Sequence, residues 1–168
     1  MRVGIGYDSH RFAADRPLVL GGVEIPDHPG LAGHSDGDAV AHAVIDAILG
    51  AGGVGNVGSL FPPGDGAWKD ADSLDLLARA VHALEERNYQ VVNVDVTVIC
   101  ETPRIGPHVD AMRERLGRAL RIGSAGVSVK GKTNEGMGWL GRSEGLAVHA
   151  VALVDAMRGL DEEWASTP

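Results

Sequence analysis

The chain has very little cysteine and few aromatic residues. Among its 168 residues are one cysteine, Cys100, three tryptophans, two tyrosines and two phenylalanines. A single cysteine excludes an intrachain disulfide and a zinc cluster built from several cysteines, and it suits a reducing compartment. The scarcity of large rings predicts a core made mainly of valine, leucine and alanine side chains.

Targeting and membrane-spanning signals are also missing. The first residues alternate at once between apolar and other side chains, without the charged and apolar regions of a signal peptide. No run of apolar residues approaches the roughly 18 that a membrane-spanning helix needs. We therefore expect a cytoplasmic protein that does not enter the membrane.

Basic residues are outnumbered. The chain has 15 Lys and Arg against 23 Asp and Glu, a formal net charge of −8. This balance argues against nucleic acid or an anionic membrane as a partner, although a local phosphate pocket is compatible with it. With 44% hydrophobic residues and 24 glycines, the chain can form one packed domain with many tight loops.

The stretch His34–His42, HSDGDAVAH, leads from a polar cluster into a helix. Apolar residues every three to four positions predict a buried face on a helix over residues 38–50. We interpret Ser35 as its N-cap and Asp38 as the capping-box partner. His42 lies one turn into this helix, either packed in the core or binding a ligand, and Asp46 one turn later could orient it.

Alternating patterns predict strands on either side of this helix. In residues 1–10, Val3, Ile5 and Tyr7 share one face, while Asp8 and His10 share the other with two glycines. Residues 18–25 read as a hairpin with a Gly-Gly turn. Further strands are expected at Val92–Ile99 and from Val127 onward, and further helices at 72–84 and 107–120.

The last apolar segment, Leu146–Asp155, is ambiguous between a central strand and a buried helix, because nearly every position is apolar. The order of elements nevertheless predicts an α+β fold. We expect a single domain over residues 1–157, with a mixed β-sheet and helices packed on one face. Residues 158–168 are expected to form a polar C-terminal tail.

Two constellations carry possible chemistry. Asp8, His10 and His42 come from a strand end and a helix start, so they could converge, and two imidazoles with one carboxylate suit zinc. Only three protein ligands would leave a coordination position open, as in catalytic sites. Each residue alone could equally be ordinary, a polar strand end or a core histidine, and spacing does not decide between these readings.

The second constellation is Lys132–Glu135 with Arg142. Lys and Arg bind phosphates, and a glutamate could hold a hard cation through oxygen, although a solvated charged loop has the same composition. The glycine-rich loops 52–66 and 131–145 match no standard nucleotide-binding spacing, and no nucleophilic serine or cysteine motif is visible. Metal and electrostatic catalysis at a phosphate is the chemistry best supported by these residues.

Longer motifs are similar to those of a known family. GIGYDSHRF at 4–12, LVLGGVEIP at 18–26, HSDGDAVAHAVIDAILGA at 34–51, LFPPGD at 60–65, NVDVTVICETPRI at 93–105 and KTNEGMGWLGRSEG at 132–145 resemble the 2-C-methyl-D-erythritol 2,4-cyclodiphosphate synthases of the non-mevalonate isoprenoid pathway. The resemblance implies a cyclic homotrimer with active sites at its subunit interfaces. It also implies a lyase reaction in which 4-diphosphocytidyl-2-C-methyl-D-erythritol 2-phosphate cyclises and releases CMP.

The resemblance implies roles for particular residues. Asp8, His10 and His42 would bind zinc, Glu135 would hold magnesium or manganese, and His34 and Thr133 would stabilise the transition state. The expected substrate contacts are Asp8, Ser9, His10, His34, Ser35, Asn56, Val57, Gly58, Phe61, Pro62, Pro63, Gly64, Asp65, Cys100, Glu101, Thr102, Pro103, Arg104, Ile105, Gly106, Lys132, Thr133, Asn134, Glu135, Trp139 and Arg142.

The chain also departs from the family pattern. Asn56 replaces the more usual aspartate, Pro63-Gly64 replaces a segment that often contains one, and His149 stands where some members have glutamate. Two other functions remain open on residues alone. One is a metal-dependent phosphohydrolase, and the other is a regulatory module that binds cytidine diphosphate compounds without turnover.

Overall fold

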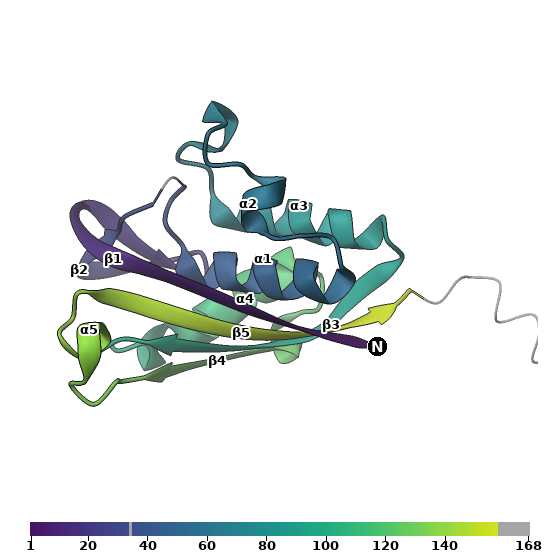
Figure 1. Ribbon diagram of the computed structural model, residues 1–168. Coiled ribbons are helices and arrows are strands. Elements are labelled where there is room, and N and C mark those ends of the chain that lie inside the picture. The colour runs from purple at the N-terminus through teal and green to yellow at the C-terminus, as the bar shows by residue number, and fades with distance from the viewer. Residues whose placement is uncertain (34, 158–168) are drawn as a thin grey trace, which may run out of the picture.

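The computed structural model describes residues 1–33 and 35–157, which form one mixed β-sheet with helices on one face (Figure 1). The strands are β1 Arg2–Leu20, β2 Val23–Leu31, β3 Tyr89–Ile99, β4 Val127–Lys132 and β5 Gly145–Ala156. The helices are α1 Ala39–Gly52, α2 Val57–Leu60, α3 Ser73–Glu85, α4 Val109–Ala119 and α5 Gly138–Gly141, and three short 3-10 turns cover Gly66–Trp68, Gly106–His108 and Ser124–Gly126. The predicted α+β class and single mixed sheet are therefore confirmed, and the predicted tail, residues 158–168, lies outside the described residues.

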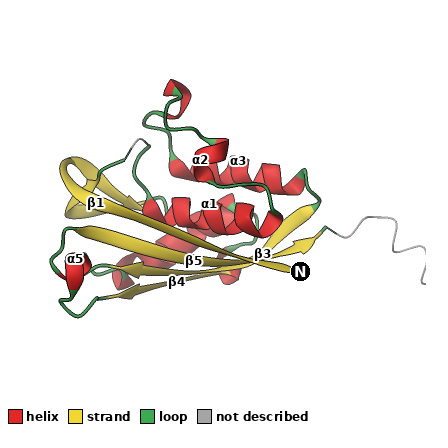
Figure 2. Ribbon diagram, viewed as in Figure 1, coloured by secondary structure: helices red, strands yellow, loops and turns green. Residues whose placement is uncertain are grey.

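The sheet has the strand order β2-β1-β5-β3-β4, and its strands are drawn in yellow in Figure 2. Strands β3 and β4 run parallel, and the other neighbours run antiparallel. The ambiguous segment at 146–155 is a strand, β5, hydrogen-bonded to β1 on one side and to β3 on the other. Val148, Ala150 and Ala152 are fully buried on the helix side, whereas Val151 on the other face is 43% exposed, so apolar residues occupy both faces of β5.

The predicted alternation in β3 is wrong at one residue. Val94, Val96 and Val98 are buried as expected, but Val92 is 42% exposed and Val91 is buried instead. The pairing of β3 with β5 shifts register between Val91 and Asn93. Such a bulge reverses the faces of the residues that precede it, because side chains alternate with period two.

Helix α1 lies unusually close to β1. A Cβ atom on Gly4 would stand 2.0 Å from the carbonyl oxygen of Ala47, and one on Gly6 would stand 1.8 Å from that of Ala43. Only glycine leaves room for this approach, because any side chain would overlap helix backbone. The same face of β1 carries Asp8, so the short distance brings this carboxylate next to the first turn of the helix.

Asp38, and not Ser35, is the N-cap of α1, so the predicted capping arrangement is wrong. The Asp38 carboxylate is fully buried and accepts hydrogen bonds from the backbone N–H groups of Val40 and Ala41, both at 3.0 Å. It also accepts from Gly21 at 2.8 Å and Gly22 at 2.6 Å, the two residues of the predicted hairpin turn. Burial raises the pKa of Asp38 to about 6, although the backbone donors favour its charged form. One side chain thus joins the β1–β2 turn to the start of α1.

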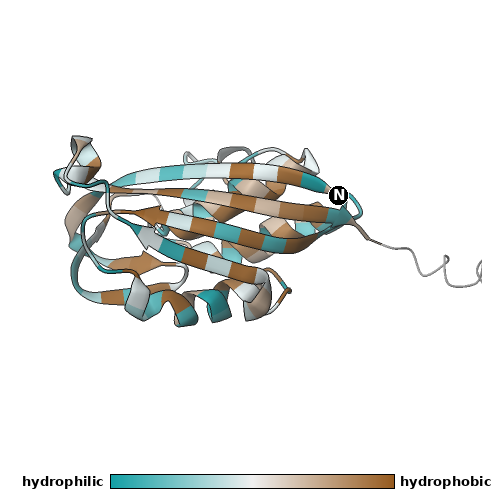
Figure 3. Cartoon of the chain, turned by 90° about the horizontal axis from the view of Figure 1, so that it is seen from below, coloured by the Kyte–Doolittle hydropathy of each residue, from teal (hydrophilic) through white to brown (hydrophobic). Residues whose placement is uncertain are grey.

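In residues 1–33 and 35–157, no helix covers the opposite face of the sheet. Val3, Ile5 and Tyr7 on β1 are 68%, 70% and 50% exposed, and Val151, which pairs with Ile5, is 43% exposed. Figure 3 looks onto this open face, where apolar residues form bands across neighbouring strands. An apolar surface of this kind is typical of a contact with another protein chain. Among the described residues, no helix combines the length and apolar character that crossing a membrane requires.

The close approach of α1 to β1 can be tested with two glycine substitutions. Gly6→Ala should lower the free energy of unfolding by about 3 kcal/mol or more, because helix and strand must separate to admit the methyl group. Gly50→Ala is the matched control, at an exposed position of α1 where an added Cβ would meet no atom within 4 Å outside the backbone of its own helix. It should raise stability by about 0.5 to 1 kcal/mol. Equal stabilities of the two variants in urea unfolding would contradict this packing.

Candidate metal centre and substrate cavity

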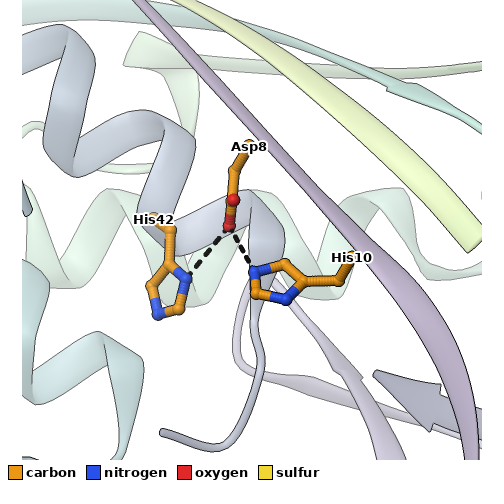
Figure 4. A group of neighbouring side chains, drawn as sticks. All are labelled: Asp8, His10 and His42. Atoms are coloured by element: carbon orange, nitrogen blue, oxygen red, sulfur yellow. Dashed lines mark hydrogen bonds and ion pairs between the residues drawn. The ribbon is translucent and has the colours of Figure 1, made fainter. Parts of the chain in front are cut away.

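Three side chains predicted as metal ligands converge in the structure (Figure 4). Asp8 and His10 come from β1, and His42 comes from the first turn of α1. The Asp8 Oδ2 atom lies 2.8 Å from Nε2 of His10 and 3.1 Å from Nδ1 of His42. All three candidate ligand atoms lie within 4.8 Å of one another, so one ion could contact them together after small side-chain shifts.

The hydrogen-bonding pattern of His10 suits a cation at this point. Its Nδ1–H donates to the carbonyl oxygen of Ala32 at 2.5 Å, since a carbonyl can only accept. In the neutral ring, Nε2 then presents a lone pair to the Asp8 carboxylate. Two lone pairs face each other stably only with a proton or a metal ion between them.

The charges of the group lead to the same conclusion. Burial would raise the pKa of Asp8, but its hydrogen bonds to both imidazoles hold that pKa well below the ordinary value. A hydrogen bond that the Asp8 carboxylate accepts raises the pKa of His10 despite partial burial. Asp8 therefore stays ionised and attracts positive charge to this site, as a metal ligand must. The donor set of two imidazoles and one carboxylate fits a divalent transition metal.

Asp46 does not orient His42, contrary to the sequence interpretation. Its carboxylate instead accepts a hydrogen bond from the backbone N–H of Val57 at 2.7 Å, which fastens the start of α2. The Nε2 atom of His42 faces the hydroxyl groups of Ser35 and Ser73, each at 3.0 Å. Ser73 was not predicted, because it lies 31 positions further along the chain and only the fold brings it near.

The metal group opens into a cavity of about 500 Å³. Ten of the predicted site residues line this cavity. They come from β1, from α1 and the segment before it, and from the loop around α2, so proximity in the sequence explains their grouping only in part. The ten are Asp8, His10, Ser35, His42, Val57, Gly58, Phe61, Pro63, Gly64 and Asp65. The cavity thus joins the metal group to part of the predicted glycine-rich loop 52–66.

Asn56 itself stays outside this cavity and caps α2. Its side-chain oxygen accepts the backbone N–H of Ser59 at 2.9 Å, within a capping box. Aspartate, the more usual residue at this position in the family, is an equally good N-cap. The departure at Asn56 therefore preserves the local structure.

Sequence reasoning missed several residues around this cavity. Trp68 and Lys69 line it, and Trp68 packs edge-to-face against Phe61 with ring centroids 5.1 Å apart. The indole N–H of Trp68 is buried and has no hydrogen-bond partner among the described residues. Arg16 donates to the carbonyl oxygens of Gly33 and Ser35 and so holds the backbone on both sides of residue 34. Lys69 could have been predicted, because it follows the Pro63-Gly64 loop that was already expected to contact the substrate. Nothing in the local sequence indicated a role for Arg16.

A second cavity, of about 430 Å³, lies between the segment after β3 and the end of β4. Its predicted lining residues are Cys100, Glu101, Pro103, Arg104, Ile105, Gly106, Lys132 and Thr133. The Glu101 carboxylate accepts backbone N–H groups of Asn134 at 2.9 Å and Gly136 at 3.2 Å, which ties the two loops together. Burial raises the pKa of Cys100 to about 11, so its thiol stays protonated and is no nucleophile.

Within the described part of the chain, the two cavities have no lining residue in common. Strand β1 carries Asp8 and β4 leads to Thr133, and two strands lie between them, which separates them by about 14 Å along the sheet. Ser9 and Trp139 line a third cavity beside His10, and Arg142 pairs with Glu144 at 2.7 Å. The predicted residues that line none of these three cavities are Asn56, Pro62, Thr102, Asn134, Glu135 and Arg142, and His34 lies outside the described residues.

Fold and site together define an α+β domain in which an Asp-His-His group able to hold a metal ion lines a cavity of about 500 Å³. Comparison with known proteins identifies the family. The model of the YgbB family matches residues 1–155. The chain therefore belongs to the YgbB family, and it is an enzyme, a lyase with 2-C-methyl-D-erythritol 2,4-cyclodiphosphate synthase activity.

Individual relatives are similar over nearly their full lengths. The 2-C-methyl-D-erythritol 2,4-cyclodiphosphate synthase of Symbiobacterium thermophilum is 56% identical over 154 residues, covering 92% of this chain and 98% of the relative. That of Gemmatimonas aurantiaca is 55% identical over 157 residues, covering 94% and 95%. A solved synthase structure in a CDP-bound form is 36% identical, with a TM-score of 0.83, and the match covers 92% of this chain and 100% of that one.

Removal of one ligand tests the metal centre. The His42→Ala variant should reduce bound divalent metal from about one ion per chain to nearly none, because two remaining protein ligands hold an ion poorly. Metal content after dialysis is the measurement. His82→Ala, which removes an exposed histidine from α3, should keep full occupancy. A fully occupied His42→Ala variant would contradict the assignment.

Proposed function

We propose that the cavity beside Asp8, His10 and His42 is where this enzyme cyclises 4-diphosphocytidyl-2-C-methyl-D-erythritol 2-phosphate to 2-C-methyl-D-erythritol 2,4-cyclodiphosphate and releases CMP. The convergence of these three ligands on one point of the cavity is the observation that carries the proposal. The reaction forms a bond from a 2-phosphate oxygen to the β-phosphorus. It breaks the bond from that phosphorus to the oxygen bridging to the α-phosphate, and this oxygen leaves with CMP.

The protein needs to supply no nucleophile for this reaction, because the attacking oxygen belongs to the substrate. Its residues act by positioning and by neutralising charge, as in other phosphoryl transfers. Asp8, His10 and His42 would hold zinc, which when bound draws electron density from a β-phosphate oxygen. Ser35 and the lining from Val57 to Asp65 would hold the methylerythritol phosphate part, and Lys69 adds a positive charge near the same cavity.

The second cavity is proposed to receive the cytidine part. The CDP bound in the related solved structure supports a nucleotide ligand for this fold. Glu135 offers only oxygen ligands and would hold magnesium or manganese near the diphosphate. The Thr133 hydroxyl donates to a Glu135 carboxylate oxygen at 2.8 Å, so the two side chains proposed to act on the diphosphate are already linked. His34 is proposed to assist Thr133 in stabilising the transition state.

Product analysis tests the reaction. With the authentic substrate and zinc plus magnesium, the enzyme should yield CMP and the cyclic diphosphate in equal amounts. Glu135→Gln should lose most of this activity and keep its zinc, because it removes the negative charge of the proposed ligand of the hard cation and changes none of the three proposed zinc ligands. A linear monophosphate product would instead indicate a phosphohydrolase, and binding of CDP without any turnover would indicate a regulatory module.

We further propose that three chains form a cyclic trimer with active sites shared between neighbours. The open apolar face around Val3, Ile5 and Tyr7 supports an interface there. His149 lies on the same face, with its ring 5.0 Å from that of Tyr7. The distance of three strand spacings between Asp8 and Thr133 supports a site completed by a neighbour. The heterologous contacts of a ring can join the two cavities of adjacent subunits.

Mixed trimers test the sharing of sites. Asp8→Ala removes a ligand from the part of a shared site that binds zinc. Glu135→Gln changes the part that the neighbouring subunit would contribute. Each variant alone should therefore be nearly inactive. A mixed ring restores one intact junction in three, and random equal mixing makes about three quarters of the trimers mixed, so roughly a quarter of wild-type activity should return.

Size-exclusion chromatography of the co-expressed variants checks that trimers assemble. A differently tagged copy of each variant allows mixed rings to be isolated. Mixed trimers that stay as inactive as their parents would show that each subunit holds a complete site.

A further inference from the structure

His42 can act as a metal ligand only if one particular nitrogen carries its proton. Its Nδ1 faces Asp8 and the metal position, so this atom must offer a lone pair and the proton must sit on Nε2. An N–H at Nε2 needs an acceptor, because the ring is largely buried. In His10 the two nitrogens have the opposite roles. Its Nδ1–H donates to the carbonyl of Ala32, and its Nε2 faces Asp8.

The acceptor available to His42 is unusually well defined. The Ser73 hydroxyl oxygen lies 3.0 Å from Nε2 of His42, and Ser73 is fully buried. This hydroxyl donates its own proton to Oδ1 of Asp36 at 2.5 Å. With its only proton used in that bond, the oxygen can meet His42 only as an acceptor. The carboxylate charge of Asp36 also makes it a stronger acceptor.

Asp36 keeps Ser73 in this orientation from two sides. Its Oδ2 atom accepts the backbone N–H of Ser73 at 3.0 Å, so both the main chain and the side chain of Ser73 are attached to one carboxylate. Asp36 is itself held by its backbone N–H, which donates to the carbonyl of Ala71 at 3.2 Å. The start of α3 is thereby fastened to the loop that precedes α1.

We propose that Ser73, oriented by Asp36, is a positioning residue that presents the Nδ1 lone pair of His42 to the metal and so sets the affinity of the site. The inference rests on the metal-binding part of the proposed function. It assigns to α3 a part in metal binding, although α3 supplies none of the three ligands. Loss of such an outer hydrogen bond typically weakens metal binding by about 10- to 100-fold.

Ser35 provides the internal comparison. Its hydroxyl oxygen also lies 3.0 Å from Nε2 of His42, but no carboxylate among the described residues reaches it. It accepts a long hydrogen bond from Gly37 N–H, at 3.3 Å, and lies 3.4 Å from the Ser73 hydroxyl. Its proton is not committed in the way that the Ser73 proton is. Ser35 can therefore serve either as donor or as acceptor, and it does not select one form of the imidazole.

The test is zinc affinity, measured on the full-length chain by competition with a fluorescent chelator. We expect Ser73→Ala to raise the zinc dissociation constant by about 10- to 100-fold. Asp36→Asn, which keeps the volume and removes the charge, should change it in the same direction. Ser35→Ala should have a smaller effect than either. If Ser73→Ala does not fold, Asp36→Asn against Ser35→Ala carries the comparison.

A spectroscopic measurement separates positioning from a merely structural role. In the zinc-loaded wild-type protein, the Nε2–H of His42 should give a slowly exchanging ¹H–¹⁵N signal, which Ser73→Ala should lose and Ser35→Ala should keep. Wild-type affinity in Ser73→Ala, or a larger loss in Ser35→Ala, would overturn the inference. Absence of zinc binding by the wild-type chain itself would instead overturn the metal assignment, so the two failures are distinguishable.

Discussion

The contact between β1 and α1 is the constraint on which the rest of the structure depends. Gly4 and Gly6 have no side chains, so the helix backbone lies directly against the strand. The residue that follows on the same face of β1 is Asp8, and the residue one turn into α1 is His42. Their contact at 3.1 Å is a direct result of this packing. A larger residue at either glycine would move the two ligands apart.

The candidate metal centre combines this packing with a particular distribution of charge. One carboxylate stands between two imidazoles, and the remaining ring nitrogens are held by Ala32 on one side and by Ser35 and Ser73 on the other. Asp36 and Asp38, both in the loop before α1, perform different tasks. Asp38 fixes where the helix starts, and Asp36 attaches the loop to α3. The two aspartates of the HSDGD motif thus give structural support to the histidine that follows them.

Much of the fold followed from local sequence patterns. The alternation in residues 1–10, the Gly-Gly hairpin turn and the three long helices are visible as periodicity, and the structure contains all of them. Two errors were local in origin. Ser35 and Asp38 are both good N-caps by residue type, and the bulge that exposes Val92 leaves no mark in a run of valines. Nor could periodicity assign Leu146–Asp155, because a strand with apolar residues on both faces and a buried helix have the same composition.

By itself, the sequence determined the residue types available for chemistry: two histidines and an aspartate that suit a divalent metal, oxygen ligands in Glu135, and no nucleophile. It also contained the motifs by which the family is recognised. Only the tertiary structure decided which residues meet. Ser73 reaches His42 across 31 positions, Asp46 turns away to Val57, and Thr133 lies three strand spacings from Asp8. These outcomes depend on strand order and on how closely helices approach the sheet, which are properties of long-range packing that no local pattern encodes.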